Sequence, residues 1–206
     1  MHDKIVLNRI HQNGYEKIVE AKDPKSGLHA IFVIHRSKPN TSIGGLRIHS
    51  YASIEEALND ALRLAKGMSY KAALADIPYG GGKSIILLKP KQKKTQRLLT
   101  AFAQVLNQLN GEYICGVDLG ATVDDMNIIR QTSPYVAGLN KDNIRVDLSS
   151  YTAWGCFRGI QATAQRLWGS SNLNNKTVAI QGLGNVGYKL MEHLFWAGAN
   201  LIASDT

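Results

Sequence analysis

The stretch Tyr79-Gly80-Gly81-Gly82-Lys83-Ser84-Ile85-Ile86-Leu87-Leu88 decides the fold of this chain of 206 residues. Residues 84–88 form a short apolar run that predicts a buried strand, and three glycines place Lys83 at the mouth of that strand. Glycines remove side chains from a surface, so a ligand can approach the backbone there. A lysine beside such a surface indicates chemistry, because an ordinary solvated lysine needs no clearing.

A helix is predicted before this stretch. Ser53-Ile54-Glu55-Glu56 is a capping box that begins it, and Pro78 with the glycines ends it. Lys71 lies on the border of the apolar stripe of this helix and is expected to point toward the interior or a cleft, whereas Lys66 falls on its polar side. The stripe consists of Ile54, Ala57, Leu58, Ala61, Leu62, Ala65 and Met68.

Strands and helices alternate over the rest of the chain, which predicts an α/β protein. Residues 137–150 are polar and irregular and mark a boundary, so we expect a domain at 1–145 with a mixed sheet, a linker helix at 146–170 and a second domain at 171–206. The other expected elements are strands at 16–22, 28–36, 113–115, 177–181 and 201–204, and helices at 95–110, from Thr122 to before Pro134, at 152–168 and at 185–197. Gly44-Gly45 interrupts a mixed stretch that ends near Ser50.

The second domain begins like a dinucleotide-binding fold. The turn Gly182-Leu183-Gly184-Asn185-Val186-Gly187 follows a predicted strand and opens a predicted helix, and Asp205 closes the next strand. In such a unit Gly182 makes the tight turn, Gly184 lets the backbone approach the pyrophosphate and Gly187 packs the helix closely, with the helix N-terminus stabilising the phosphates. Asp205 would accept hydrogen bonds from the ribose and repel a 2′-phosphate. The sequence therefore predicts NAD rather than NADP.

Only the first two strands of this second domain are encoded, whereas a complete domain of this type has about six. The sequence accordingly predicts either a fragment of a longer enzyme or a truncated product.

Composition excludes several classes of protein. A hydrophobic fraction of 44% is typical of a globular protein with a core. No apolar run approaches a membrane span or a signal peptide, so a cytoplasmic protein is expected. Cys115 and Cys156 have neither disulfide nor zinc spacing, and no metal is expected. The net charge of +8 concentrates in residues 89–97, which have no aromatic residue for base stacking. We interpret them as a solvated loop, not a nucleic-acid site.

Several motifs, in order, resemble the Glu/Leu/Phe/Val family of amino acid dehydrogenases, most of all leucine dehydrogenase. They are Gly44-Gly45-Leu46-Arg47, the segment 61–71, Gly81-Gly82-Lys83, Val117-Asp118-Leu119-Gly120, Thr122-Val123-Asp124-Asp125-Met126 and Gln181-Gly182-Leu183-Gly184-Asn185-Val186. The resemblance implies NAD-dependent, reversible oxidative deamination of a branched-chain or apolar L-amino acid to the 2-oxo acid and ammonia. It also implies a homo-oligomer.

The resemblance implies a role for each matching residue. Lys83 and Asp118 match the catalytic lysine and aspartate, and Lys71 matches the lysine that binds the substrate carboxylate. The backbone at Gly44 and Gly45 matches the substrate-lining segment, Ile43 and Gly116 match the side-chain pocket, and Thr152 matches a hydroxyl that contacts the nicotinamide amide. Gly182, Gly184, Asn185, Val186, Gly187 and Asp205 match the cofactor site.

Elementary chemistry agrees with these roles. Removal of a hydride from Cα leaves an iminium that water must attack, and a base must activate that water. Free lysine titrates near ~10.4, so the pKa of Lys83 has to fall, and we expect burial and the positive charge of Lys71 to lower it. Asp118 can pass protons to the departing ammonia.

Two other hypotheses remain. Gly82-Lys83-Ser84 is similar to a phosphate-binding loop, but that motif needs a glycine at position 77, which is Ile77, and a preceding strand where a helix is predicted. The second is a truncated paralogue without activity, which binds amino acids or assembles with other subunits.

Overall fold

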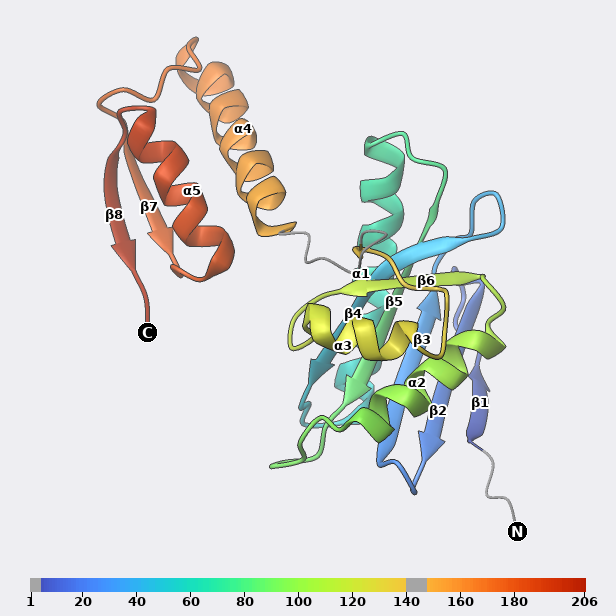
Figure 1. The fold of residues 1–206 in the computed structure, drawn as a ribbon. Coiled ribbons are helices and arrows are strands. Elements are labelled where there is room, and N and C mark those ends of the chain that lie inside the picture. Colours follow the sequence, from blue (N-terminus) through green and yellow to red (C-terminus); the bar gives the residue numbers. More distant parts are fainter. Residues whose placement is uncertain (1–4, 140–147) are drawn as a thin grey trace. The chain divides into compact units, whose positions relative to one another are not determined.

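The computed structural model describes residues 5–139 and 148–206. The chain divides into two compact units, residues 1–145 and 146–206, and each is described by itself (Figure 1). Most of the irregular segment predicted at 137–150 lies outside the described residues, and residues 148–150 are helical rather than irregular.

The first unit is built on a mixed sheet of six strands in the order β1-β2-β3-β5-β4-β6. Each neighbouring pair from β1 to β5 is antiparallel, and β4 is parallel to both β5 and β6. The strands are β1 (Val6–Ile10), β2 (Lys17–Asp23), β3 (Leu28–Ile34), β4 (Ser42–His49), β5 (Gly80–Leu87) and β6 (Tyr113–Val117). The sequence did not predict β1 or β4, because β1 is largely exposed and β4 contains Gly44-Gly45, which weaken a strand pattern.

Helices cover both faces of this sheet (Figure 1). On one face α1 (Ile54–Leu74) packs through alanines against Ile31, Val33 and Ile85. On the other face α2 (Gln96–Gln108) and α3 (Val123–Arg130) cover the larger core, where the Phe32 and Phe102 rings stack with centroids 4.9 Å apart. The predicted helices of this unit are thus confirmed, with ends shifted by a few residues.

The helix starts show how the local sequence sets these elements. The capping box predicted at Thr122 is complete, since Thr122 and Asp125 each accept from the other's backbone N–H. The one predicted at Ser53 is only half formed: Ser53 Oγ accepts from Glu56 N at 3.1 Å, but the Glu56 carboxylate accepts from Ala52 N instead. Both arrangements satisfy backbone donors that the first turn of a helix leaves free.

The three glycines before Lys83 belong to β5 and are buried, so the prediction that Lys83 stands at the mouth of the strand was wrong. They serve close packing instead of clearing a surface. A Cβ on Gly81 would lie 2.1 Å from Ser69 N of α1, and one on Gly82 would lie 2.7 Å from the Tyr113 ring. Helix α1 therefore sits directly on the strand, and Gly81 N donates to Ser69 Oγ at 3.0 Å.

This packing makes a stability prediction. Gly81→Ala should lower the free energy of unfolding by about 1–3 kcal/mol, because rigid backbone of α1 occupies the place of the new methyl group. The matched control is Gly67→Ala in the same helix, where a Cβ meets nothing within 4 Å. That variant should raise stability by roughly 0.5–1 kcal/mol, since alanine favours helix over glycine. Urea unfolding followed by circular dichroism measures both, and equal effects would contradict the packing argument.

The second unit contains α4 (Leu148–Trp168), β7 (Thr177–Gln181), α5 (Asn185–Trp196) and β8 (Asn200–Ser204). Strands β7 and β8 are parallel and joined by α5, which forms a βαβ unit. A small core holds α4 and α5 on the strands through Phe157, Leu173 and Leu194. The elements expected here are confirmed, although the first helix begins before Thr152.

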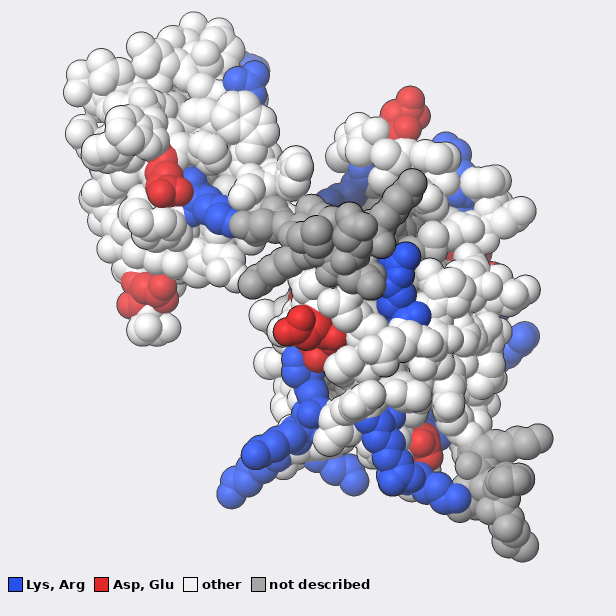
Figure 2. All heavy atoms as spheres, viewed as in Figure 1, with Lys and Arg blue, Asp and Glu red and all other residues white. Residues whose placement is uncertain are grey.

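The basic segment forms the loop between β5 and α2 and leads into that helix, as the solvated-loop interpretation predicted. Lys and Arg side chains gather at the end of the first unit where this loop lies (Figure 2). Lys89, Lys91 and Lys93 are exposed, whereas Lys94 donates to Asp125 at 2.5 Å and to the Gly120 carbonyl at 2.9 Å. No helix among residues 5–139 and 148–206 is long and apolar enough to cross a bilayer.

Candidate functional site

Lys83 and Asp118 meet on the face of the sheet that α1 partly covers. Lys83 lies on β5 and Asp118 follows β6, so strand β4, which pairs with both, lies between them. Lys83 Nζ nevertheless donates to Asp118 Oδ2 at 2.6 Å. Gly45 of β4 permits this, because a Cβ there would lie 2.7 Å from Asp118 Cβ. Because β4 has no side chain at Gly45, the amine and the carboxylate can meet above that strand.

The loop that carries Asp118 is fixed to β4 by its backbone. Ile48 N donates to the Leu119 carbonyl at 2.9 Å, and Ala121 N donates to the Asp118 carbonyl at 3.0 Å. Gly120 has φ +78°, and a Cβ there would lie 2.0 Å from the Ile48 carbonyl oxygen. A glycine is therefore required for the turn that presents Asp118.

Burial and charge tune the two groups in a way that suits acid–base chemistry. Lys83 is only 4% exposed, and this burial lowers the pKa of its amine, while the bonded Asp118 carboxylate opposes the change and Arg47 adds to it. Burial alone would raise the pKa of Asp118, but the hydrogen bonds and charges of Lys83 and Arg47 outweigh it and lower that pKa. Asp118 stays a carboxylate, and Lys83 releases its proton more readily than a free lysine.

Arg47 and Asp60 complete the site, and sequence reasoning gave neither a role. Arg47 Nε donates to Asp118 Oδ2 at 3.0 Å, and its Nη1 donates to Asp60 Oδ2 at 2.7 Å. The cation beside Lys83 is therefore Arg47 rather than Lys71. Arg47 is the last residue of the motif Gly44-Gly45-Leu46-Arg47, and a strand prediction there would have placed it on the same face as Gly45, two residues earlier.

Lys71 departs from its expected placement. It lies in the last turn of α1 and is exposed, as Lys66 is, instead of pointing into an interior. Within the described residues its side chain has no hydrogen-bond or ion-pair partner, and Lys71 is not among the main causes of the shift of the Lys83 pKa. Its role in binding a carboxylate stays a prediction.

The other residues expected to line a substrate lie near the pair on β4 and β6. Gly45 pairs with Gly116 and Ile43 with Ile114 in register, and Ile43, Gly45 and Gly116 are half-buried. A Cβ on Gly116 would meet only atoms 3.8 Å or more away, so this position has room. Gly44 has none, because a Cβ there would lie 1.9 Å from the Gly82 carbonyl oxygen.

The glycine turn of the second unit is tight and leads directly into α5. Gly182 has φ +94°, and a Cβ on Gly187 would lie 1.9 Å from the Gly182 carbonyl oxygen, which keeps α5 close to the turn. A Cβ on Gly184 would meet nothing within 4 Å, and no side chain caps α5 at Gly184. Space and free backbone donors therefore coincide at the N-terminus of α5, at Asn185 and Val186.

Asp205 and Thr152, which are predicted to contact a cofactor, form hydrogen bonds within the second unit. Asp205 is exposed, and its carboxylate accepts from Thr206 N at 2.7 Å and Leu183 N at 2.9 Å, which lowers its pKa. Each oxygen keeps a lone pair for a further donor. Thr152 Oγ1 donates to the Leu148 carbonyl at 3.0 Å inside α4.

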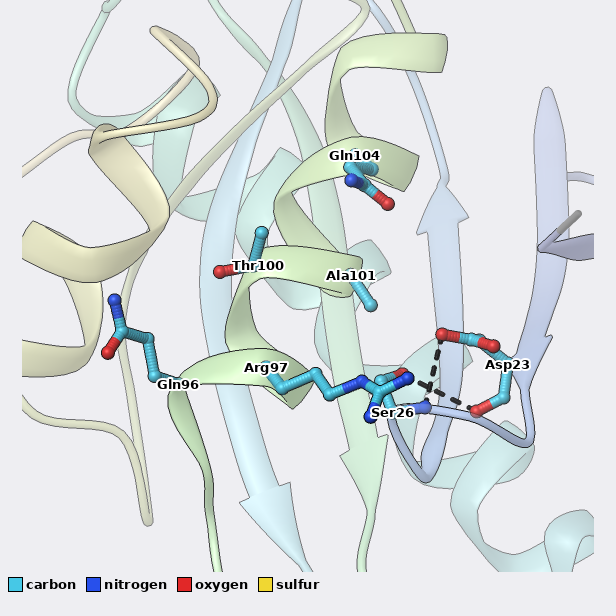
Figure 3. Close-up of a pocket in the computed structure, with 7 residues that line it drawn as sticks. All are labelled: Asp23, Ser26, Gln96, Arg97, Thr100, Ala101 and Gln104. Atoms are coloured by element: carbon cyan, nitrogen blue, oxygen red, sulfur yellow. Dashed lines mark hydrogen bonds between the residues drawn. The ribbon is translucent and has the colours of Figure 1, made fainter.

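A separate hollow of about 520 Å³ lies between α2 and the β2–β3 turn (Figure 3). Its walls are polar, but Asp23 already accepts from the backbone N–H of Ser26 at 3.2 Å and of Lys25 at 3.1 Å. Nothing in this hollow adds to the lysine–aspartate site. The residues that line it are Asp23, Ser26, Gln96, Arg97, Thr100, Ala101 and Gln104.

A mixed α/β domain in which a buried lysine bonds to an aspartate, together with a βαβ unit that carries a glycine-rich turn, defines the class of protein. Residues 15–135 match the family model described as Glu/Leu/Phe/Val dehydrogenase, dimerisation domain. The chain belongs to this family.

Curated relatives agree. The chain is 43% identical over 192 residues to leucine dehydrogenase of Bacillus subtilis, covering 93% of this chain and 53% of the relative. It is 43% identical to phenylalanine dehydrogenase of Lysinibacillus sphaericus, covering 93% and 50%, and 40% identical to valine dehydrogenase of Streptomyces coelicolor, covering 94% and 54%. The chain thus spans about half the length of the curated relatives it matches.

Solved structures show the same fold. L-tryptophan dehydrogenase from Nostoc punctiforme superposes with a TM-score of 0.70 at 38% identity, covering 94% of this chain and 54% of that one. A hetero-hexameric glutamate dehydrogenase from Thermus thermophilus gives a TM-score of 0.72 at 23% identity, covering 99% and 50%, and supports the fold alone.

Removal of the carboxylate tests the coupling of the pair. Asp118→Asn should lower the free energy of unfolding by about 1–3 kcal/mol near pH ~7, since it leaves a buried ammonium without its anion. The pKa of Lys83 is already lowered in the folded state, so its charged form costs stability below that pKa, and this cost fades as the pH rises toward ~10.4. The deficit of the variant should therefore shrink at alkaline pH.

Urea unfolding at several pH values measures this deficit. Asp76→Asn is the matched control, because Asp76 is exposed and asparagine tolerates its φ of 49°. A deficit that is the same at every pH would count against the assigned pairing.

Proposed function

We propose that the protein carrying this chain is an NAD-dependent amino acid dehydrogenase that oxidises an apolar, leucine-type L-amino acid to the 2-oxo acid and ammonia. The observation that supports it most is the 2.6 Å bond between the amine of Lys83, which is 4% exposed, and the Asp118 carboxylate. A surface ion pair needs no such burial, whereas a lysine base needs a lowered pKa.

The proposed roles follow from the atoms that remain available. Lys83, once it has lost its proton, takes a proton from the water that attacks the iminium carbon. Asp118 binds Lys83 and Arg47 through Oδ2 only, and among the described residues Oδ1 has no partner. Because the Asp118 side chain is 29% exposed, Oδ1 can accept from the substrate amine and pass protons to the departing ammonia. Lys71, exposed at the end of α1, can bind the substrate carboxylate.

The substrate side chain is proposed to lie over Ile43 and Gly116. The open position at Gly116 and the aliphatic Ile43 favour a branched apolar group over a charged one. The names of the relatives support this class, since they act on leucine, phenylalanine and valine. Gly44 and Gly45 would contribute backbone atoms, as their missing side chains leave no free volume.

The second unit is proposed to hold NAD, which would accept the hydride from Cα. The residues present fit the group. Gly182, Gly184 and Gly187 leave backbone donors and open space at the N-terminus of α5, Asn185 and Val186 begin that helix, and Asp205 is exposed at the end of β8. Thr152 is exposed and can exchange its helical bond for the nicotinamide amide.

We also propose that the protein is a homo-oligomer. The matched region is described as a dimerisation domain, and the relative from Thermus thermophilus is hetero-hexameric.

The catalytic assignment predicts that Lys83→Ala abolishes turnover while the fold persists. Activity is assayed as formation of reduced nicotinamide with L-leucine, L-valine and L-phenylalanine. The assay uses the chain itself and the chain joined to the C-terminal half of the Bacillus subtilis relative. A general base typically raises the reaction rate by about 10²–10⁴-fold, so its removal should lower kcat by at least that factor.

Lys66→Ala serves as the control, because Lys66 is an exposed lysine of the same helix as Lys71. This substitution should leave kcat unchanged. Circular dichroism checks that both variants fold. Normal turnover by a folded Lys83→Ala protein would refute the assignment.

The cofactor assignment predicts that Asp205→Ser weakens the binding of NAD and strengthens the binding of NADP. The carboxylate bonds to ribose hydroxyls but repels a 2′-phosphate, so the ratio of the two dissociation constants should move toward NADP by about tenfold or more. Calorimetric titration of the chain with each dinucleotide measures it, with Glu192→Gln on α5 as the control. An unchanged ratio would mean that Asp205 does not face the ribose.

A further inference from the structure

The Lys83–Asp118 pair is one end of a longer network. Arg47 Nη1 donates to Asp60 Oδ2 at 2.7 Å, and the Tyr51 hydroxyl donates to the same oxygen at 2.7 Å. Arg47 Nε donates to Asp118 Oδ2, the oxygen that Lys83 also uses. Two carboxylate oxygens thus each receive two donors, and Arg47 belongs to both sets.

Arg47 joins parts of the first unit that are far apart in the sequence. It lies on β4, Asp60 lies on α1, and Asp118 lies in the loop after β6. Its side chain is 21% exposed, and those of Asp60 and Asp118 are 24% and 29% exposed, so these bonds form in a partly desolvated place. The planar guanidinium can serve two carboxylates in fixed directions, which a lysine ammonium on a flexible stem cannot.

We propose that Arg47 is a positioning residue for the reaction, which holds the Asp118 carboxylate at Oδ2 and is itself aligned by Asp60 and Tyr51. This inference rests on the proposed function. Its consequence is that Asp118 presents Oδ1 to the substrate in one orientation. The hydroxyl of Tyr51 is three hydrogen bonds from the Asp118 carboxylate, yet it takes part in fixing that group.

The same network acts on Lys83 with opposite signs. The charged groups that act on its amine are Asp118 after β6, Arg47 on β4 and Asp60 on α1, while its neighbour on β3 is the apolar Val33. The positive charge of Arg47 lowers the pKa of Lys83, and the negative charge of Asp60 raises it. Removal of Arg47 and removal of Asp60 should therefore shift the pKa of Lys83 in opposite directions.

The first experiment follows the titration of Lys83 in the 206-residue chain without any substrate. Trace acetylation with acetic anhydride across a pH series, read by mass spectrometry, gives the apparent pKa of each lysine. Arg47→Gln should raise the pKa of Lys83 and Asp60→Asn should lower it. Arg63→Gln is the control, because Arg63 is an exposed arginine of α1 and should change nothing. Shifts of the same sign in both variants, or none, would overturn the proposal.

Tyr51→Phe keeps the test decisive if Asp60→Asn fails to fold. It removes one hydroxyl from Asp60 and leaves every charge in place, so the pKa of Lys83 should move less than in Arg47→Gln.

The second experiment measures kcat and KM in whichever protein of the preceding assay turns over. Arg47→Gln should lower kcat by about 10- to 100-fold, the loss of one charge-assisted hydrogen bond, with a smaller change in KM for the amino acid. Arg47→Lys should restore the charge but only part of kcat. Full activity of Arg47→Lys would overturn the positioning role.

The two experiments separate this inference from the proposed function. If the unchanged protein oxidises no amino acid, the proposed function fails, whereas opposite shifts of the Lys83 pKa would still establish the network. If the unchanged protein is active and Arg47→Gln retains its kcat, the positioning role fails alone.

Discussion

The site depends on one constraint, which is that strand β4 carries no side chain at Gly45. Neighbouring strands in a sheet lie about 4.8 Å apart, so Lys83 and Asp118, on either side of β4, are separated by two such spacings. The lysine side chain spans this distance only because nothing stands above Gly45, where a Cβ would lie 2.7 Å from Asp118 Cβ. The sheet order, with β4 between β5 and β6, is therefore as much a part of the site as the two side chains.

The glycines that surround the site do two different things. Gly44, Gly81 and Gly82 bring backbone or ring atoms into contact and leave no room, and they hold β4, β5, α1 and Tyr113 together. Gly116 and Gly184 have open space where a side chain would be, and these are the positions that a ligand can use. A glycine-rich sequence does not distinguish the two, because both need the absence of a Cβ.

This difference explains how far the sequence could be interpreted. Periodicity predicted α1, and cap residues predicted the start of α3 at Thr122, because these signals are local. Strand β4 escaped prediction, since its pattern is broken by Gly44 and Gly45 and its pairing partners lie far along the chain. Lys83 and Asp118 could be named from motifs, but their separation by β4, the exposure of Lys71 and the place of Arg47 depend on sheet order, which no local window contains.

The electrostatics of the site follow from this arrangement. A buried amine with one carboxylate would be a strong ion pair, and its pKa would rise if the attraction exceeded the loss of hydration. Here burial is the largest influence on the pKa of Lys83, and the positive charge of Arg47, bonded to the same Asp118 oxygen, offsets part of the attraction of the carboxylate. The pKa of Lys83 is consequently lowered although its anion is 2.6 Å away. Sharing one oxygen between two cations keeps Asp118 charged, and the lowered pKa of Lys83 is what the proposed role as a base requires.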